Sequence, residues 1–75
     1  MVKVSEALPA EDYTLLVKLD DGRSGTFDVS PFLDKGIFAE LRDRSYFAQV
    51  RVHGRSISWP HKQDFCADTI EALMH

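Results

Sequence analysis

The sequence predicts an α+β fold: a small antiparallel sheet of two hairpins plus a short first strand, with short helical turns in the middle and a C-terminal helix. Three observations support this prediction. Apolar and polar residues alternate in two separate regions, a glycine-containing turn divides each region, and the last ten residues repeat apolar side chains at helical spacing. We therefore expect a sheet-based core that is closed by one terminal helix.

Residues 2–9 predict a short first strand at the edge of the sheet. Val2 and Val4 alternate with polar neighbours, and this run ends near Pro9. Proline lacks the N–H that a central strand donates, so it is confined to strand ends and sheet edges. We expect this strand to be an outer one.

Residues 13–29 predict the first hairpin. Apolar residues occupy every second position of 13–19, which is typical of a strand with one buried face. Gly22 favours a tight turn, because glycine reaches positive φ without a Cβ clash. Phe27 and Val29 continue the buried face in the returning strand.

Residues 30–47 predict short helical turns. Ser30 and Pro31 are typical of an N-cap followed by the first helical position. Residues 34–36 end this turn, and the apolar residues of 37–41 recur at the spacing of one helical face. Ser45 is predicted to cap a further turn.

Residues 50–74 predict the second hairpin and the terminal helix. Alternation runs through 50–53 and 57–59, with Gly54 in the turn between them, and Pro60 ends the last strand. A polar loop follows at 61–64. Apolar residues then recur at helical spacing: Cys66, Ile70, Leu73 and Met74.

A length of 75 residues falls short of a typical domain, so we expect a single domain, 1–75. A chain of this size buries only about 60–65% of its unfolded surface, so association with a second copy or with another small protein would add buried area. The single cysteine, Cys66, cannot form an intramolecular disulfide, and no leader or membrane-spanning run is present. We expect a cytoplasmic protein that forms a homodimer or binds a small protein partner.

The charge is unevenly distributed along the chain. The net charge is −3, yet the segment 42–62 has a net charge of +4. This argues against a protein whose whole surface binds nucleic acid, and leaves one basic segment as a candidate surface for a partner or for nucleic acid. Its candidate residues are Arg42, Arg44, Arg51, His53, Arg55 and Lys62. Exposed strand faces also carry arginine for solubility alone, and we favour this interpretation.

His61, Asp64 and Cys66 form the densest cluster of chemically reactive types. Catalysis needs such groups to converge on a pocket, whereas three groups in one loop usually diverge. We expect Asp64 to accept backbone N–H bonds at the end of the loop and Cys66 to be a small buried thiol. The sequence thus predicts no catalytic residue and no cofactor.

A metal site is not expected either. His53, His61 and Cys66 are the available imidazole and thiolate ligands, but a structural zinc site needs four ligands at short paired spacings. Trp59 alternates with Ile57, so we expect its ring to lie in the core rather than to stack on a ligand.

Short motifs spread along the chain resemble the bacterial domain of unknown function family 2442. The most specific parts are Phe27-Asp28-Val29 before a proline and Trp59-Pro60 with Asp64 four residues later. That family usually places Asn and Gly between Trp-Pro and Asp, whereas this chain has His61-Lys62-Gln63. We therefore expect a different loop conformation, without the positive φ that glycine allows.

The resemblance implies a compact domain of antiparallel strands and short helices, without an established enzymatic activity. Members of the family are often encoded beside another small protein in loci that resemble toxin–antitoxin modules, and some carry a helix-turn-helix domain after this one. We expect a non-catalytic binding module for a protein partner. The alternative is a nucleic-acid-binding regulator that uses the segment 42–62.

Overall fold

The structure, a computed structural model that describes residues 2–75, contains two antiparallel sheets of three strands each. The first sheet has the order β1-β2-β3 and the second has the order β4-β5-β6. These strands are β1 (Val4–Pro9), β2 (Thr14–Leu19), β3 (Ser24–Asp28), β4 (Arg51–His53), β5 (Ser56–Ser58) and β6 (Asp64–Cys66). The helix α2 (Ala67–Leu73) follows β6, and the predicted α+β class is confirmed.

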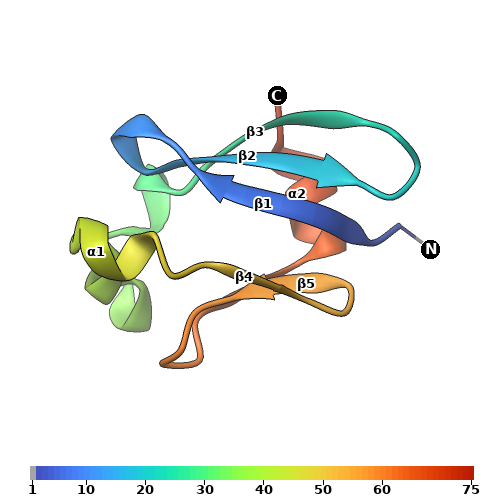
Figure 1. Ribbon diagram of the computed structural model, residues 1–75. Helices are drawn as coiled ribbons and strands as arrows, with labels where there is room; N and C mark the ends of the chain where they lie inside the picture. The colour runs from blue at the N-terminus through green and yellow to red at the C-terminus, as the bar shows by residue number, and fades with distance from the viewer. Residues whose placement is uncertain (1) are drawn as a thin grey trace.

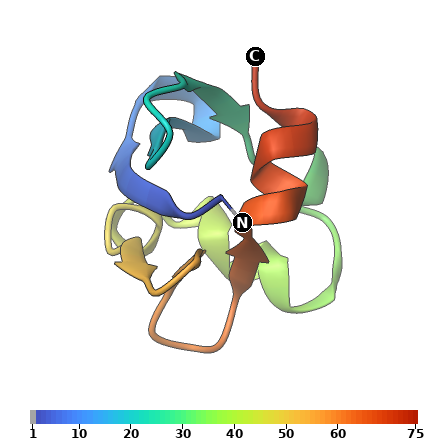
Figure 2. The same cartoon turned by 90° about the vertical axis from the view of Figure 1, so that its right-hand side faces the viewer.

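The strands and α2 surround one apolar core. β1 lies against β4 and β5 on one side of the molecule, while α2 contacts β3 and β6 on the other side (Figure 2). Both sheets, the central turns and α2 contribute fully buried side chains to this core, among them Leu15, Phe27, Leu41, Ile57 and Ile70. The predicted burial of Trp59 is confirmed, because its side chain is 3% exposed.

Short helical turns lie between β1 and β2 and between β3 and β4, and those between β3 and β4 gather at one end of the molecule (Figure 1). They are the 3-10 turns η1 (Glu11–Tyr13), η2 (Ser30–Phe32) and η3 (Gly36–Arg42) and the helical turn α1 (Arg44–Phe47).

Aspartates, rather than the predicted serines, accept backbone N–H groups at the start of two of these turns. Ser30 is the first residue of η2, and its N–H donates to Asp28 Oδ1 at 2.9 Å. Asp43 is the N-cap of α1, and its Oδ1 accepts the N–H of Ser45 at 2.9 Å. A carboxylate is a good acceptor for exposed helical N–H groups. Ser30 is therefore the first residue of η2 and Ser45 the second residue of α1, and each donates its N–H to the aspartate two residues before it.

Strand β6 was absent from the predicted elements. With β6, the strands form two sheets of three strands each, whereas one sheet was predicted. Phe65 pairs with Ile57 in the core, while Asp64 and Cys66 are exposed on either side of it. A strand with one apolar residue is too short to show a period of two. Asp64 was predicted to accept backbone N–H bonds at the end of the loop 61–64. This prediction is wrong, because the residue begins β6 opposite Ser58. The predicted burial of Cys66 is also wrong.

A β-bulge divides β1. Val4 pairs with Leu19 and Glu6 pairs with Lys18, so Ser5 is an extra residue on the β1 side. Its hydroxyl donates to the Lys18 carbonyl at 3.0 Å. An inserted residue shifts the alternation of all following side chains, and Leu8 consequently lies on the outer face although Val4 is buried.

The C-terminal residue pairs with β3. Thr26 N–H donates to His75 O at 2.9 Å, and His75 N–H donates to Thr26 O at 2.8 Å. A Cβ on Gly25 would lie 2.4 Å from the His75 carbonyl oxygen, so only glycine allows this approach. The buried side of α2 consists of Ala67 and Ile70, whereas Leu73 is 45% exposed, contrary to its predicted burial.

Candidate functional site

The six candidate residues of the basic segment lie on several different elements. Arg42 ends η3 and its Nε donates to Leu33 O at 3.1 Å, while Arg44 begins α1. Lys62 lies in the turn before β6, at φ +81°. This positive φ differs from the expectation that a turn without glycine would avoid the left-handed region.

Two of these six residues, Arg51 and His53, share one face of β4. Val52 pairs with the buried Ile57, so its neighbours in β4 project from the outer face of the second sheet. Ser58 is the cross-strand partner of Arg51 and also of Asp64, which places an acid in the same row as Arg51.

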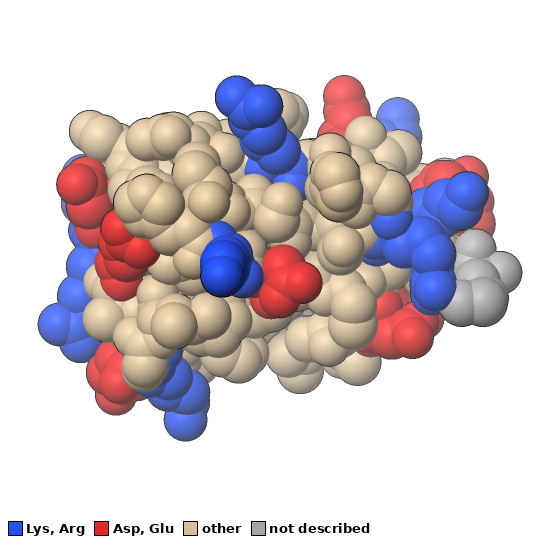
Figure 3. All heavy atoms as spheres, turned by 90° about the horizontal axis from the view of Figure 1, so that it is seen from below, with Lys and Arg blue, Asp and Glu red and all other residues tan. Residues whose placement is uncertain are grey.

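Acidic residues accompany the basic ones elsewhere on this side of the molecule. Arg55, in the turn between β4 and β5, lies 3.8 Å from the Asp68 carboxylate. Viewed from the side of β5, blue and red side chains are interspersed, and much of the centre is neither (Figure 3). The +4 charge of the segment 42–62 therefore does not appear as one continuous basic patch on this face.

The five signature residues have separate structural roles. Phe27 is fully buried, and Asp28 accepts the Ser30 N–H at the start of η2. Trp59 Nε1 donates to Phe47 O at 2.9 Å, which joins the end of β5 to α1. Pro60 is exposed in the turn that follows, and Asp64 begins β6. They hold elements together and do not converge on one pocket.

The reactive cluster predicted around Cys66 is divided between two environments. Asp64 and Cys66 project from the outer face of β6, whereas the His61 ring lies against Glu40 of η3. The Cys66 Sγ is 3.3 Å from Thr69 Oγ1, and this hydrogen bond lowers the pKa of the thiol below its ordinary value. Within residues 2–75, no group of three potential metal ligands comes together.

A polar network that the sequence did not indicate connects the turn 60–63 to η3 and α1. Gln63 is 1% exposed, and its Oε1 accepts the hydroxyl proton of Tyr46 at 2.6 Å. Its Nε2 donates to Ile37 O at 2.8 Å and to Glu40 Oε1 at 2.9 Å. Both the oxygen and the nitrogen of this buried amide therefore have hydrogen-bond partners, as a buried polar group requires.

The exposed end of this network is an imidazole and carboxylate pair. His61 Nδ1 lies 2.5 Å from Glu40 Oε2, and the His61 backbone N–H donates to Tyr46 Oη at 2.7 Å. Hydrogen bonds from Gln63 and then His61 lower the pKa of Glu40 below its ordinary value. The His61 and Tyr46 rings also stack, with centroids 5.1 Å apart. Each group has a partner within the protein, which indicates a structural role.

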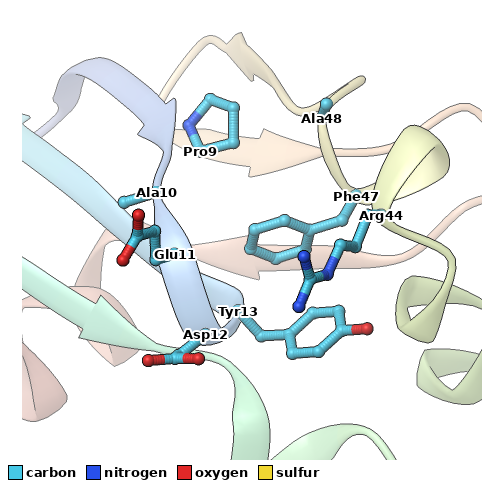
Figure 4. A pocket seen from close by; sticks show the side chains of 8 residues that line it. All are labelled: Pro9, Ala10, Glu11, Asp12, Tyr13, Arg44, Phe47 and Ala48. Carbon is cyan, nitrogen blue, oxygen red and sulfur yellow. The ribbon is translucent and has the colours of Figure 1, made fainter.

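A hollow of about 500 Å³ opens beside η1. The Arg44 guanidinium points into it between the rings of Tyr13 and Phe47, while Glu11 and Asp12 lie on the other side (Figure 4). Asp12 and Tyr13 both adopt positive φ, at 57° and 59°. The Tyr13 hydroxyl donates to the Arg42 carbonyl and so holds this conformation. The hollow presents charges of both signs, and these favour no single class of ligand.

The outer face of the first sheet carries an exposed apolar pair. Leu8 and Leu16 are cross-strand partners and are 53% and 47% exposed. They lie in a shallow hollow of about 340 Å³ that Glu6, Lys18 and Thr26 also line. These two leucines are the large apolar side chains that this face presents to solvent.

Comparison with known proteins gives one family. The sequence model of the family described as "Protein of unknown function (DUF2442)" matches residues 4–75. The chain belongs to the DUF2442 family. This membership confirms the resemblance drawn from the Phe-Asp-Val and Trp-Pro motifs. The matched range contains both sheets, the polar network and both hollows of this DUF2442 protein.

No curated protein and no solved structure matches the chain. The DUF2442 assignment itself names no activity. In the described part of this DUF2442 chain, no helix is both long and apolar enough to cross a membrane.

Proposed function

We propose that this DUF2442 protein is a small bacterial binding module without catalytic activity, which recognises a protein partner. The observation that carries the proposal is the exposed pair Leu8 and Leu16 on the outer face of the first sheet. Each leucine is already about half buried, so covering the rest of its side chain contributes about 0.8–1.5 kcal/mol, and the pair is the main apolar source of binding energy on this face.

The polar groups of the chain support a binding role rather than chemistry. The Glu40, Tyr46, His61 and Gln63 side chains hydrogen-bond to one another, which fixes the turn 60–63 against the core. The exposed thiol of Cys66 is compatible with a reducing compartment, and we propose a cytoplasmic location.

The test uses the purified chain and the purified product of the adjacent gene, the type of partner encoded in toxin–antitoxin-like loci. Titration calorimetry is expected to show binding that weakens about tenfold or more in Leu16→Gln. Leu73→Gln is the matched control, because Leu73 has a similar exposure on α2. Equal binding by both variants would contradict the proposed surface, and absence of binding would contradict this partner.

A nucleic-acid-binding regulator is the competing proposal. It is supported by Arg51 and His53, which project from the same face of β4. It predicts binding to duplex DNA that falls steeply with salt and weakens in Arg51→Ala and Arg55→Ala. Fluorescence anisotropy with a labelled duplex at about 0.05 and 0.2 M salt distinguishes the two proposals, because a protein-binding module predicts no salt-dependent DNA binding.

A further inference from the structure

The exposed face of the first sheet combines an apolar pair with a charged pair at the same register. Glu6 of β1 is the cross-strand partner of Lys18 of β2, and two residues along the strands Leu8 is the partner of Leu16. Side chains two residues apart project from the same face, so all four lie together on the outer surface. Their positions form two rows, one charged and one apolar.

Both rows are open to a partner. Leu8 and Leu16 are about half exposed, and Glu6 and Lys18 are also exposed. Neither Glu6 nor Lys18 forms an ion pair with any residue of the described range 2–75. The cross-strand acid and base thus remain free to pair with charges on another molecule.

This pattern is self-complementary under a two-fold rotation. An axis parallel to the strands and midway between β1 and β2 exchanges the two strands of facing copies. Glu6 of one copy then faces Lys18 of the other, and Leu8 faces Leu16. A two-fold axis perpendicular to the strands and through the leucine row would also pair the leucines. It would place the charged row of one copy over the row of Thr14 and Asp28 of the other. Only the parallel axis satisfies both rows at once.

We propose that a second copy of this chain covers the outer face of β1 and β2, with the two sheets packed face to face about this axis. The inference rests on the proposed binding function and names the partner. Sheets pack about 10 Å apart in this manner, with their strands nearly aligned. The contact is isologous, so it closes at two copies.

The size of the face sets the strength of this dimer. With the axis midway between β1 and β2, these two strands overlap in the facing copies and β3 lies outside the overlap. Two strands spaced about 4.8 Å apart, with six residues rising about 3.3 Å each, give a contact of roughly 10 by 20 Å. This is small beside the roughly 800 Å² that each partner buries in a standard stable interface. The dimer is accordingly weak, and its population rises over concentrations from about 10 μM to 1 mM.

The test is charge reversal read by sedimentation equilibrium at about 0.1 M salt. In the Glu6→Lys dimer, the introduced lysine of each copy faces Lys18 of the other copy. In the Lys18→Glu dimer, the introduced glutamate of each copy faces Glu6 of the other copy. Each single variant is expected to dimerise on the order of tenfold more weakly than the wild type. An equimolar mixture of the two variants restores both opposite-charge contacts, so it is expected to associate more strongly than either variant alone.

Matched controls separate this result from general charge effects. Glu11→Lys and Lys35→Glu make the same charge changes at exposed positions outside the sheet. These variants are expected to dimerise like the wild type, and their mixture is expected to show no added association. Leu16→Gln is expected to be monomeric, with a wild-type far-ultraviolet circular dichroism spectrum.

Two results would overturn the proposed dimer. One is a wild-type chain that remains monomeric at about 1 mM, and the other is a mixture that associates no better than its single components. Leu16-dependent binding of the adjacent gene product would in that case preserve the proposed binding function. If the dimer forms but the adjacent gene product does not bind, the proposal of an outside partner is contradicted and the proposed dimer is retained.

Discussion

Gln63 is the residue on which the turn between β5 and β6 depends. It is the one buried polar side chain among the described residues, and it bonds to Tyr46, Glu40 and the Ile37 carbonyl. These partners come from α1 and η3, more than ten residues away in sequence. One amide therefore joins three separate elements.

Replacing Gln63 with Leu should destabilise the fold by roughly 1–3 kcal/mol, because Tyr46 and Glu40 each lose a hydrogen-bond partner while the volume stays similar. Urea unfolding followed by Trp59 fluorescence measures this change. Gln49→Leu is the control, since Gln49 is exposed and should change stability by less than about 0.5 kcal/mol. Equal effects of the two substitutions would show that the network contributes nothing specific.

Glu40 should give the protein a specific acid sensitivity. Hydrogen bonds from Gln63 and His61 lower its pKa below the ordinary value of 4.5. A carboxyl group with a lowered pKa in the folded state stabilises the fold above its unfolded value, and this contribution is lost as the pH falls through the folded value.

We therefore expect the stability difference between wild type and Glu40→Gln to be constant above about pH 5.5 and to shrink below pH 4.5. Thermal unfolding between pH 3 and 7 tests this, with Glu11→Gln as the exposed control. A difference that stays constant down to pH 3 would rule out the Glu40 contribution.

Sequence patterns predicted the buried residues well but not this network. The alternation in 13–19 and the Ile57-Ser58-Trp59 pattern correctly placed Leu15, Val17, Ile57 and Trp59 in the core. Residues 61–64 were predicted as a polar loop, because His, Lys, Gln and Asp carry no apolar period. The burial of Gln63 arises from contacts with η3 and α1, which no local pattern contains.

The bulge in β1 shows the same limit at the scale of an element. The alternation of Val2 and Val4 predicts that Leu8 faces the core. The extra residue Ser5 reverses the alternation, so Leu8 faces solvent. A bulge depends on the pairing with β2, so the candidate binding face was not visible in the sequence although its strands were.

Strand β3 and the C-terminal residue should respond together to substitution of Gly25. A Cβ in Gly25→Ala would meet the His75 carbonyl oxygen at 2.4 Å, so the end of the chain must move away. Losing the two hydrogen bonds between Thr26 and His75 should lower stability by roughly 1–3 kcal/mol. Hydrogen exchange of the Thr26 amide is expected to accelerate at the same time.

A double-mutant cycle isolates this contact. Removal of residues 74–75 abolishes the same two hydrogen bonds, so Gly25→Ala should have little further effect in the truncated chain. Additive effects would show that Gly25→Ala acts through β3 itself rather than through His75.

At the scale of the whole molecule, the two sheets share one core, and each leaves its outer face exposed. The sequence correctly predicted the α+β class and the C-terminal helix, because these follow from local periodicity. The division into two sheets follows from the pairing of β5 with the three-residue strand β6, which is too short to predict.

A dimer formed only by the folded chain should make thermal stability depend on concentration. We expect the Tm to rise between about 10 μM and 1 mM, by roughly 4–8 °C for each 1 kcal/mol of stabilisation. Scanning calorimetry measures this, and Leu16→Gln should show a Tm independent of concentration. A wild-type Tm that is also independent would be inconsistent with the dimer.

The pairing of His75 with Thr26 also occupies hydrogen-bonding groups at the β3 edge of the first sheet. Unpaired strand edges can recruit further strands without limit, which leads to fibres. Here the chain's own end occupies part of the β3 edge, and β1 at the opposite edge lies against β4. Both edges of the sheet are thus occupied by the chain itself, so its outer face is the open surface, and the proposed dimer would use this face and end at two copies.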